Sequence, residues 1–191
     1  MFIGREEELK FLEDRYNSAD GQLVVLYGRR RVGKTELLRQ FCQDKEHIFY
    51  TCTEIIDEKQ LEAFSQRLLE KNHQAAKYIT RFSDWEQALL SISELAKEKK
   101  IVVVIDEFPY MVKGNNAIPS ILQKLWDEVL KQSNVMLILC GSAMSFIEKE
   151  VLAEKKPLYG RATGILKMQA MDFYSAQQFF PNYSICLLYT S

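Results

Sequence analysis

Eight residues, 28–35, limit the possible folds of this chain more than any other segment. They read GRRRVGKT and match the pattern G-x-x-x-x-G-K-[ST]. In such loops the glycines let the backbone wrap around phosphate oxygens, and successive N–H groups point inward as an anion-binding nest. The motif predicts a phosphate-binding loop, provided that a strand precedes it and a helix follows it. An ordinary glycine-rich turn is the alternative interpretation.

The residues on either side have the patterns that such a loop requires. Residues 22–27 form a β-rich apolar run, and residues 34–43 favour a helix whose N-terminus would add positive partial charge. Lys34 is then expected to reach the β- and γ-phosphates of a nucleotide. The hydroxyl of Thr35 is expected to ligate Mg²⁺.

The backbone before the lysine is expected to surround the phosphates. Six residues contribute to this part of the loop: Gly28, Arg29, Arg30, Arg31, Val32 and Gly33. The side chains of the three arginines are a separate question. They either contact the nucleotide directly or face solvent or a partner, and the sequence is compatible with both.

A second segment, residues 101–107, supplies the acidic groups that a nucleotide site with a metal ion needs. Its first five residues, IVVVI, are typical of a strand buried on both faces. Asp106 and Glu107 follow at the carboxyl end of this strand, the usual ligand-binding edge of an open α/β sheet. We expect Asp106 to orient Mg²⁺ and Glu107 to polarise a water for attack on the γ-phosphate. In the alternative, Asp106 only caps the next turn.

Two polar residues near later strands are further candidates for the same site. Ser142 follows the apolar run 135–140 and could hydrogen-bond the γ-phosphate or the attacking water; otherwise it is the N-cap of a helix near residues 144–150. Arg161 follows Gly160 and could deliver charge to the γ-phosphate, in cis or to a neighbouring subunit. The alternative for Arg161 is a surface arginine in a structural salt bridge.

The remaining patterns alternate between strands and helices. Helical stripes cover residues 5–16, 57–68, 83–96, 118–129 and 174–180, and β-rich runs cover residues 48–52 and 164–169. Asp57 with Gln60, and Ser83 with Glu86, have the form of capping boxes. This alternation predicts one α/β domain, a three-layer α/β/α sandwich with a parallel sheet covered on both faces.

Composition excludes several classes of protein. A formal net charge of -1 gives no sign of nucleic-acid binding, and the longest apolar runs are far too short to span a bilayer. The four cysteines form no C-x-x-C pair and the two histidines lie far apart, so a zinc site is not expected. These features predict a cytoplasmic protein without a membrane segment.

With these motifs in place, the chain resembles the archaeal-type ATPase family, a group of P-loop ATPases within the AAA+/STAND proteins. The resemblance extends from residue 1 to about residue 181. It rests on residues 2–8, 26–35, 105–108, 139–142 and 157–161. It implies a sheet of order 5-1-4-3-2 and ATP rather than GTP, and the chain has no guanine-reading N-K-x-D segment. It also implies that Ile3, Gly4 and Arg5 border the adenine or ribose.

The resemblance also bears on the organisation of the chain. It implies an ATPase core at residues 1–181, with a winged-helix domain and an effector domain as C-terminal partners that this chain does not contain. Residues 182–191 are then expected to be a tail. Within this tail, residues 186–191 match the translation of a sequencing-library adaptor, which suggests an artefact and a truncated reading frame.

The leading functional hypothesis is an ATP-driven regulatory switch. Binding and hydrolysis of Mg-ATP would change the contact between this core and the C-terminal part of the protein. One alternative is a nucleotide-binding scaffold that does not hydrolyse ATP. Another is a small-molecule kinase, although residues 114–116 do not form the arginine-rich lid that it needs. Assembly into oligomers and a DNA-related role through the further domains are also considered.

Overall fold

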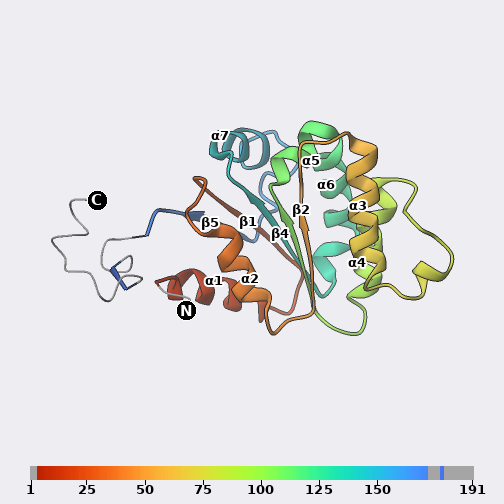
Figure 1. Ribbon diagram of the computed structural model, residues 1–191, viewed down its shortest axis with the longest axis horizontal. Coiled ribbons are helices and arrows are strands. Elements are labelled where there is room, and N and C mark those ends of the chain that lie inside the picture. Colours follow the sequence, from red (N-terminus) through yellow and green to blue (C-terminus); the bar gives the residue numbers. More distant parts are fainter. Residues whose placement is uncertain (1–3, 172–176, 179–191) are drawn as a thin grey trace.

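The computed structural model describes residues 4–171 and 177–178. These residues form a five-stranded sheet between two layers of helices, as Figure 1 shows. The strands are β1 (Gln22–Gly28), β2 (His47–Thr51), β3 (Ile101–Asp106), β4 (Val135–Gly141) and β5 (Gly164–Met168). All neighbouring strands are parallel, and their order is β2-β3-β4-β1-β5. Counted from the β5 edge this is 5-1-4-3-2, so the predicted fold class and strand order are confirmed.

Helices cover both faces of the sheet (Figure 1). One face carries α1 (Glu6–Tyr16) and α2 (Lys34–Cys42). The other carries α3 (Asp57–Leu69), α4 (Trp85–Leu95), α5 (Phe108–Gly114) and α6 (Ile118–Glu128). The short helix α7 (Met144–Phe146) continues into a π turn (Ile147–Val151), and two 3₁₀ turns span Ala75–Lys77 and Leu130–Gln132.

The three central strands explain why the sequence could be interpreted so directly. Every residue of β1, β3 and β4 is buried. In β1, Val24 and Leu26 pack toward α1 and α2, whereas Leu23 and Val25 pack toward the other helical layer. A strand buried on both faces needs apolar residues at every position, and this gives the continuous apolar runs of the sequence.

The parallel arrangement fixes where polar strand ends meet. The carboxyl ends of β1, β3 and β4 all lie at one end of the sheet, and this end, where the strands finish, is hereafter called the carboxyl edge. They carry Gly28, Asp106 and Gly141, respectively. The segments that enter the strands lie at the opposite, amino edge.

Both predicted capping boxes are wrong. Helix α4 is capped by Asp84, whose carboxylate accepts a hydrogen bond from the backbone N–H of Gln87 at 2.8 Å. Asp57 does not cap α3, because its carboxylate is taken by tertiary contacts. It accepts hydrogen bonds from Nε1 of Trp85 at 2.7 Å and from Nδ2 of Asn115 at 3.1 Å.

Helix α5 was not predicted from the sequence. It has only seven residues and begins immediately after a strand, with a proline in its first turn. A helix this short shows no full period of apolar residues. The predicted helix at residues 174–180, apart from residues 177 and 178, and the tail at residues 182–191 lie outside the described residues. Within the described part of the chain, no helix has the length and apolar character needed to cross a bilayer.

Candidate functional site

The loop between β1 and α2 needs its two glycines for different reasons. A Cβ on Gly28 would lie 2.3 Å from the carbonyl oxygen of Met168, so glycine is required for the close approach of β1 and β5. A Cβ on Gly33 would meet nothing, but its φ of 89° is in the left-handed region. Arg31 is also left-handed, with φ of 66°. Such changes of backbone hand turn successive N–H groups toward one centre, as an anion nest requires.

Lys34 lies inside this loop. Its Nζ donates to the carbonyl oxygens of Gly28 at 3.0 Å and Arg29 at 2.9 Å, and the residue is only 6% exposed. A buried ammonium needs a counter-charge, and two carbonyl dipoles supply only part of one. The concave loop around Lys34 therefore fits a phosphate group.

Thr35 and Asp106, the predicted Mg²⁺ ligands, are brought together by the fold. Oγ1 of Thr35 donates to Oδ2 of Asp106 at 2.8 Å, and Oδ1 of Asp106 accepts from the N–H of Glu107 at 3.0 Å. A hydroxyl and a carboxylate are oxygen ligands of the kind that Mg²⁺ prefers, together with water and substrate phosphate. No cluster of three or more acidic, histidine or cysteine ligands occurs among the described residues. The donor set fits a metal ion that arrives with phosphates.

Glu107 and Ser142 meet between the ends of β3 and β4. Oε2 of Glu107 accepts hydrogen bonds from Oγ of Ser142 at 3.0 Å and from its backbone N at 3.3 Å. Glu107 has φ of 52°, an uncommon conformation for a residue with a side chain and one often found at functional sites. Gly141 permits the approach, since a Cβ there would lie 2.9 Å from Cδ of Pro109 on α5.

Cys140 lies close to Asp106 within the core and was not identified from the sequence. It is fully buried in β4. Burial raises the pKa of its thiol well above the ordinary value, and the nearby carboxylate of Asp106 raises it further. Cys140 is therefore a neutral thiol at physiological pH. The sequence alone cannot predict that Cys140 lies close to Asp106, because this depends on the register of β4 beside β3.

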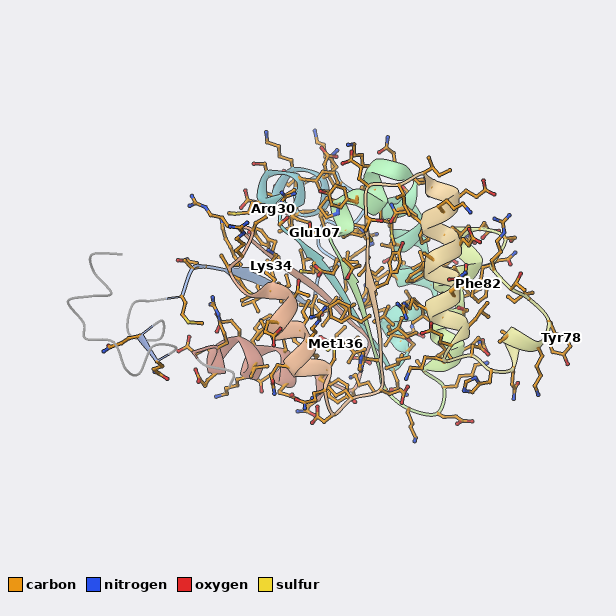
Figure 2. The ribbon with its side chains drawn as sticks, in the orientation of Figure 1. Arg30, Lys34, Tyr78, Phe82, Glu107 and Met136 are labelled. Atoms are coloured by element: carbon orange, nitrogen blue, oxygen red, sulfur yellow. The ribbon has the colours of Figure 1, made fainter. Side chains whose placement is uncertain are left out.

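A hollow of about 530 Å³ opens beside the loop. It is lined by Arg30, Arg31, Gly33, Lys34, Thr35, Glu36, Arg39, Glu107 and Tyr110. Figure 2 shows Arg30, Lys34 and Glu107 gathered at the same end of the sheet. Tyr110 and Arg39 were not predicted from the sequence. The position of Tyr110 depends on the unpredicted helix α5, whereas Arg39 is one helical turn after Thr35 and could have been identified from that spacing.

Arg5 is a buried link between the loop and the end of β5. Its Nη2 donates to the carbonyl oxygens of Val32 and Gln169, both at 2.9 Å, and its Nη1 pairs with Glu8 at 2.6 Å. Nε of Arg5 is buried without a partner among the described residues. The neighbouring Gly4 has φ of 68°, and residue 3 is outside the described part of the chain.

Arg161 lies away from the other candidates. Its Nε and Nη2 contact the carboxylate of Asp127 at 3.0 and 2.6 Å, and its Nη1 donates to the carbonyl of Pro157 at 2.9 Å. Two residues later, the N–H of Thr163 bonds to Leu23, at the beginning of β1. The phosphate loop is at the other end of β1. The structure therefore places Arg161 at the amino edge in a salt bridge, which was the alternative interpretation.

Comparison with known proteins identifies the family. The model of a family described as an ATPase domain predominantly from Archaea matches residues 2–188. The chain belongs to this family. It is 37% identical over 181 residues to the uncharacterized protein MJECL04 of Methanocaldococcus jannaschii, covering 95% of this chain and 38% of that protein. A shorter match, 52% identical over 46 residues, is to the uncharacterized ATP-binding protein MJ0423 of the same organism, 24% of this chain and 78% of that protein.

Solved structures show the same fold. The Walker-type ATPase PABY2304 of Pyrococcus abyssi has a TM-score of 0.72 and 24% identity, and the match covers 94% of this chain and 57% of that one. Cdc6p of Pyrobaculum aerophilum has a TM-score of 0.58 and 16% identity, over 86% of this chain and 45% of that one. This archaeal-type ATPase domain thus spans 38% of MJECL04 and 57% of the Pyrococcus abyssi ATPase.

Proposed function

We propose that this domain binds Mg-ATP at the carboxyl edge and hydrolyses it to ADP and phosphate. The observation that supports this most directly is the meeting of three strand ends. Lys34 and Thr35 follow β1, Asp106 and Glu107 follow or end β3, and Ser142 follows β4. Each has the side chain that one part of the reaction needs.

The proposed chemistry begins with phosphate binding. The ammonium of Lys34 would exchange its contacts with the carbonyls of Gly28 and Arg29 for the β- and γ-phosphates. Thr35 and Asp106 would hold Mg²⁺, which supplies positive charge to the phosphate oxygens when bound. The backbone N–H groups of the loop add further donors in fixed positions.

Glu107 would act as the general base. Its carboxylate would accept a proton from the attacking water as the water oxygen bonds to the γ-phosphorus and the bond to the leaving ADP oxygen breaks. In the structure, this carboxylate is held by Ser142. The Ser142 hydroxyl would then hydrogen-bond the Glu107 carboxylate before ATP binds, and the γ-phosphate or the attacking water afterwards.

Arg5 connects the proposed site with the rest of the protein. It bonds both to Val32 in the phosphate loop and to Gln169 after β5. In the proposed switch, a change of loop conformation with nucleotide would reach the segment after β5 through this guanidinium. The winged-helix and effector domains of a longer protein are proposed to receive this conformational change. Gly4 and Arg5 are also proposed to border the adenine or ribose.

A second candidate function is ATP binding without hydrolysis, in a nucleotide-binding scaffold. One observation favours it: Arg161 is engaged with Asp127 at the amino edge and does not reach the nucleotide site. Both candidate functions require ATP binding, but only the first includes ATP turnover.

Thermal unfolding with and without Mg-ATP tests the proposal, combined with an assay for released phosphate. ATP at about 100 times its dissociation constant should raise the free energy of unfolding by about 2.7 kcal/mol. Removal of Mg²⁺ with a chelator should reduce this increase. Stabilisation with phosphate release supports hydrolysis, stabilisation alone supports the scaffold, and no stabilisation of a folded chain contradicts both.

A further inference from the structure

A contact across the hollow joins the phosphate loop to helix α5. Nη2 of Arg30 donates to the phenolic oxygen of Tyr110 at 3.3 Å. Arg30 is exposed on the loop, and Tyr110 is half-buried on the helix that begins directly after Glu107. The contact is thus formed between the proposed phosphate-binding element and the element that carries the proposed base.

Tyr110 and Glu107 occupy one turn of backbone. The N–H of Tyr110 bonds to the carbonyl oxygen of Glu107 at 2.9 Å, so the two residues keep a fixed spacing. Arg30, Tyr110 and Glu107 all line the 530 Å³ hollow together with Lys34 and Thr35. Figure 2 shows the Arg30 and Glu107 side chains at the same end of the sheet. Arg30 therefore lines the same hollow as Lys34 and Glu107.

The guanidinium of Arg30 retains most of its hydrogen-bonding capacity. It carries five N–H donors, and within the described part of the chain only the Tyr110 hydroxyl accepts from it. No carboxylate of the described residues forms a salt bridge with Arg30. Arg161 differs from Arg30, because Asp127 forms a salt bridge with it at the amino edge.

The other arginines of the hollow are less well placed for this role. Arg31 and Arg39 also line it. Among the described residues, however, neither forms a hydrogen bond or salt bridge with α5, whereas Arg30 does. Arg30 is therefore the arginine of the hollow that contacts α5, the helix that begins directly after Glu107.

We propose that Arg30 supplies, from the same chain, the cation that stabilises negative charge on the γ-phosphate oxygens during hydrolysis, and that Tyr110 is its positioning residue. This inference rests on the proposed hydrolysis of ATP. Arg30 would donate hydrogen bonds to the equatorial oxygens and would neither gain nor lose a proton. The proton of the water goes to Glu107, and the electron pair of the broken bond goes to ADP. Such a cation is worth about 10³–10⁵ in kcat where it has been measured in other phosphoryl-transfer enzymes.

The test measures kcat at saturating Mg-ATP and the Kd for a fluorescent ATP analogue in the 191-residue chain and its variants. Arg30→Ala should lower kcat by about 100-fold or more and change Kd by less than about 5-fold, because Lys34 and the loop backbone remain. Arg30→Lys should restore only part of kcat, since an ammonium lacks the planar fork of donors. Tyr110→Phe should lower kcat by about threefold with unchanged Kd, as expected for the loss of one exposed hydrogen bond that positions the guanidinium. Arg81→Ala removes the same charge from an exposed pair with Glu58 outside the hollow, and should change neither value.

Two outcomes distinguish the inference from the proposal beneath it. If the unmodified chain hydrolyses ATP and Arg30→Ala retains its kcat, Arg30 is not the cation while the proposed function stands. If the unmodified chain binds Mg-ATP without turnover that depends on Glu107, both are overturned.

Mixing two inactive variants tests whether Arg30 acts within its own chain. Arg30→Ala retains the base and Glu107→Gln retains the arginine. Action in cis predicts that the mixture is no more active than the sum of its components. Recovered turnover in the mixture would show that Arg30 acts on a neighbouring copy, and would overturn the same-chain assignment.

Discussion

Two cations at the amino edge of the sheet differ from two at the carboxyl edge in how they are paired. At the amino edge, Arg161 pairs with Asp127 and Lys71 pairs with Glu46, at N–O distances of 2.6 Å in both cases. At the carboxyl edge, Lys34 has only backbone carbonyls as partners and Arg30 has only a phenol among the described residues. Carboxylates thus neutralise Arg161 and Lys71, whereas Lys34 and Arg30 keep positive charge available for an anion.

This difference also bears on stability. A salt bridge at the surface contributes little, about 0–1 kcal/mol, whereas a buried cation without a full counter-charge costs free energy. A site that binds a phosphate tightly is therefore expected to be unfavourable for the empty protein. Substitution of Lys34 at the carboxyl edge should therefore reduce function without reducing stability. Substitution of Asp127 at the amino edge should reduce stability without reducing function.

The largest expected effect is that of Lys34→Ala. We expect loss of Mg-ATP binding, and with it loss of the increase of about 2.7 kcal/mol that ATP at 100 times its Kd gives the unmodified chain. Without nucleotide, the variant should be at least as stable as the unmodified chain, because Lys34 is only 6% exposed and its ammonium contacts only carbonyl oxygens. Calorimetry and thermal unfolding measure both quantities. A large loss of stability in the nucleotide-free variant would show that Lys34 is a structural residue.

Ser142→Ala should have a smaller effect, on turnover rather than on binding. It removes the hydroxyl that bonds to Glu107 at 3.0 Å but leaves the backbone N–H in place. Loss of one hydrogen bond in the reacting state corresponds to about 1–1.5 kcal/mol, or about a tenfold lower kcat. The affinity for ATP should be nearly unchanged. Steady-state kinetics with Ser142→Thr as the conservative variant measures this; a fall in affinity with unchanged kcat would contradict the role.

Asp127→Ala probes the amino edge. We expect a loss of about 0.5–1 kcal/mol in the free energy of unfolding, because the carboxylate is half-exposed and its pair with Arg161 is screened by solvent. For a chain of this size the melting temperature should fall by about 1–4 °C. Turnover of ATP should be unchanged. Reduced turnover with intact ATP binding would instead indicate that Arg161 reaches a nucleotide, in the same or a neighbouring copy.

The smallest effect concerns pH. The ammonium of Lys71 hydrogen-bonds the carboxylate of Glu46 and lowers the pKa of this glutamate below its ordinary value. A lowered folded-state pKa contributes stability that is present above the unfolded pKa and is lost as pH falls through the folded one. Lys71→Ala should therefore cost about 0.5 kcal/mol near neutral pH and less below pH about 4. Urea unfolding at pH 7 and at pH 3.5 measures it, and an equal cost at both values would contradict the ion pair as its cause.

Much of this fold could be predicted from the sequence, because buried parallel strands need apolar residues at every position. The same reasoning predicted that Lys34, Thr35, Asp106 and Glu107 share one site, since all of them follow or end such strands, and their roles there stay predictions. It did not find α5, and therefore not Tyr110, because the helix is short and its position depends on the left-handed turn at Glu107.

The sequence also contained a signal that separates Arg161 from the other candidates. Arg161 precedes a strand, whereas Gly28, Asp106 and Ser142 follow or end strands. In a parallel sheet, residues before strands lie at the amino edge and residues after them at the carboxyl edge. The distance of Arg161 from the phosphate loop follows from this rule. The salt bridge with Asp127 could not be predicted, because it depends on how α6 packs.

The most direct test of ATP hydrolysis at the carboxyl edge is a single-turnover measurement with excess protein over Mg-ATP, comparing the unmodified chain with Glu107→Gln. If Glu107 is the general base, the two proteins should bind ATP with similar Kd. The variant should convert ATP to ADP about 10²–10⁴-fold more slowly. Equal single-turnover rates would contradict the role of Glu107, and a folded chain that binds no Mg-ATP would contradict the site itself.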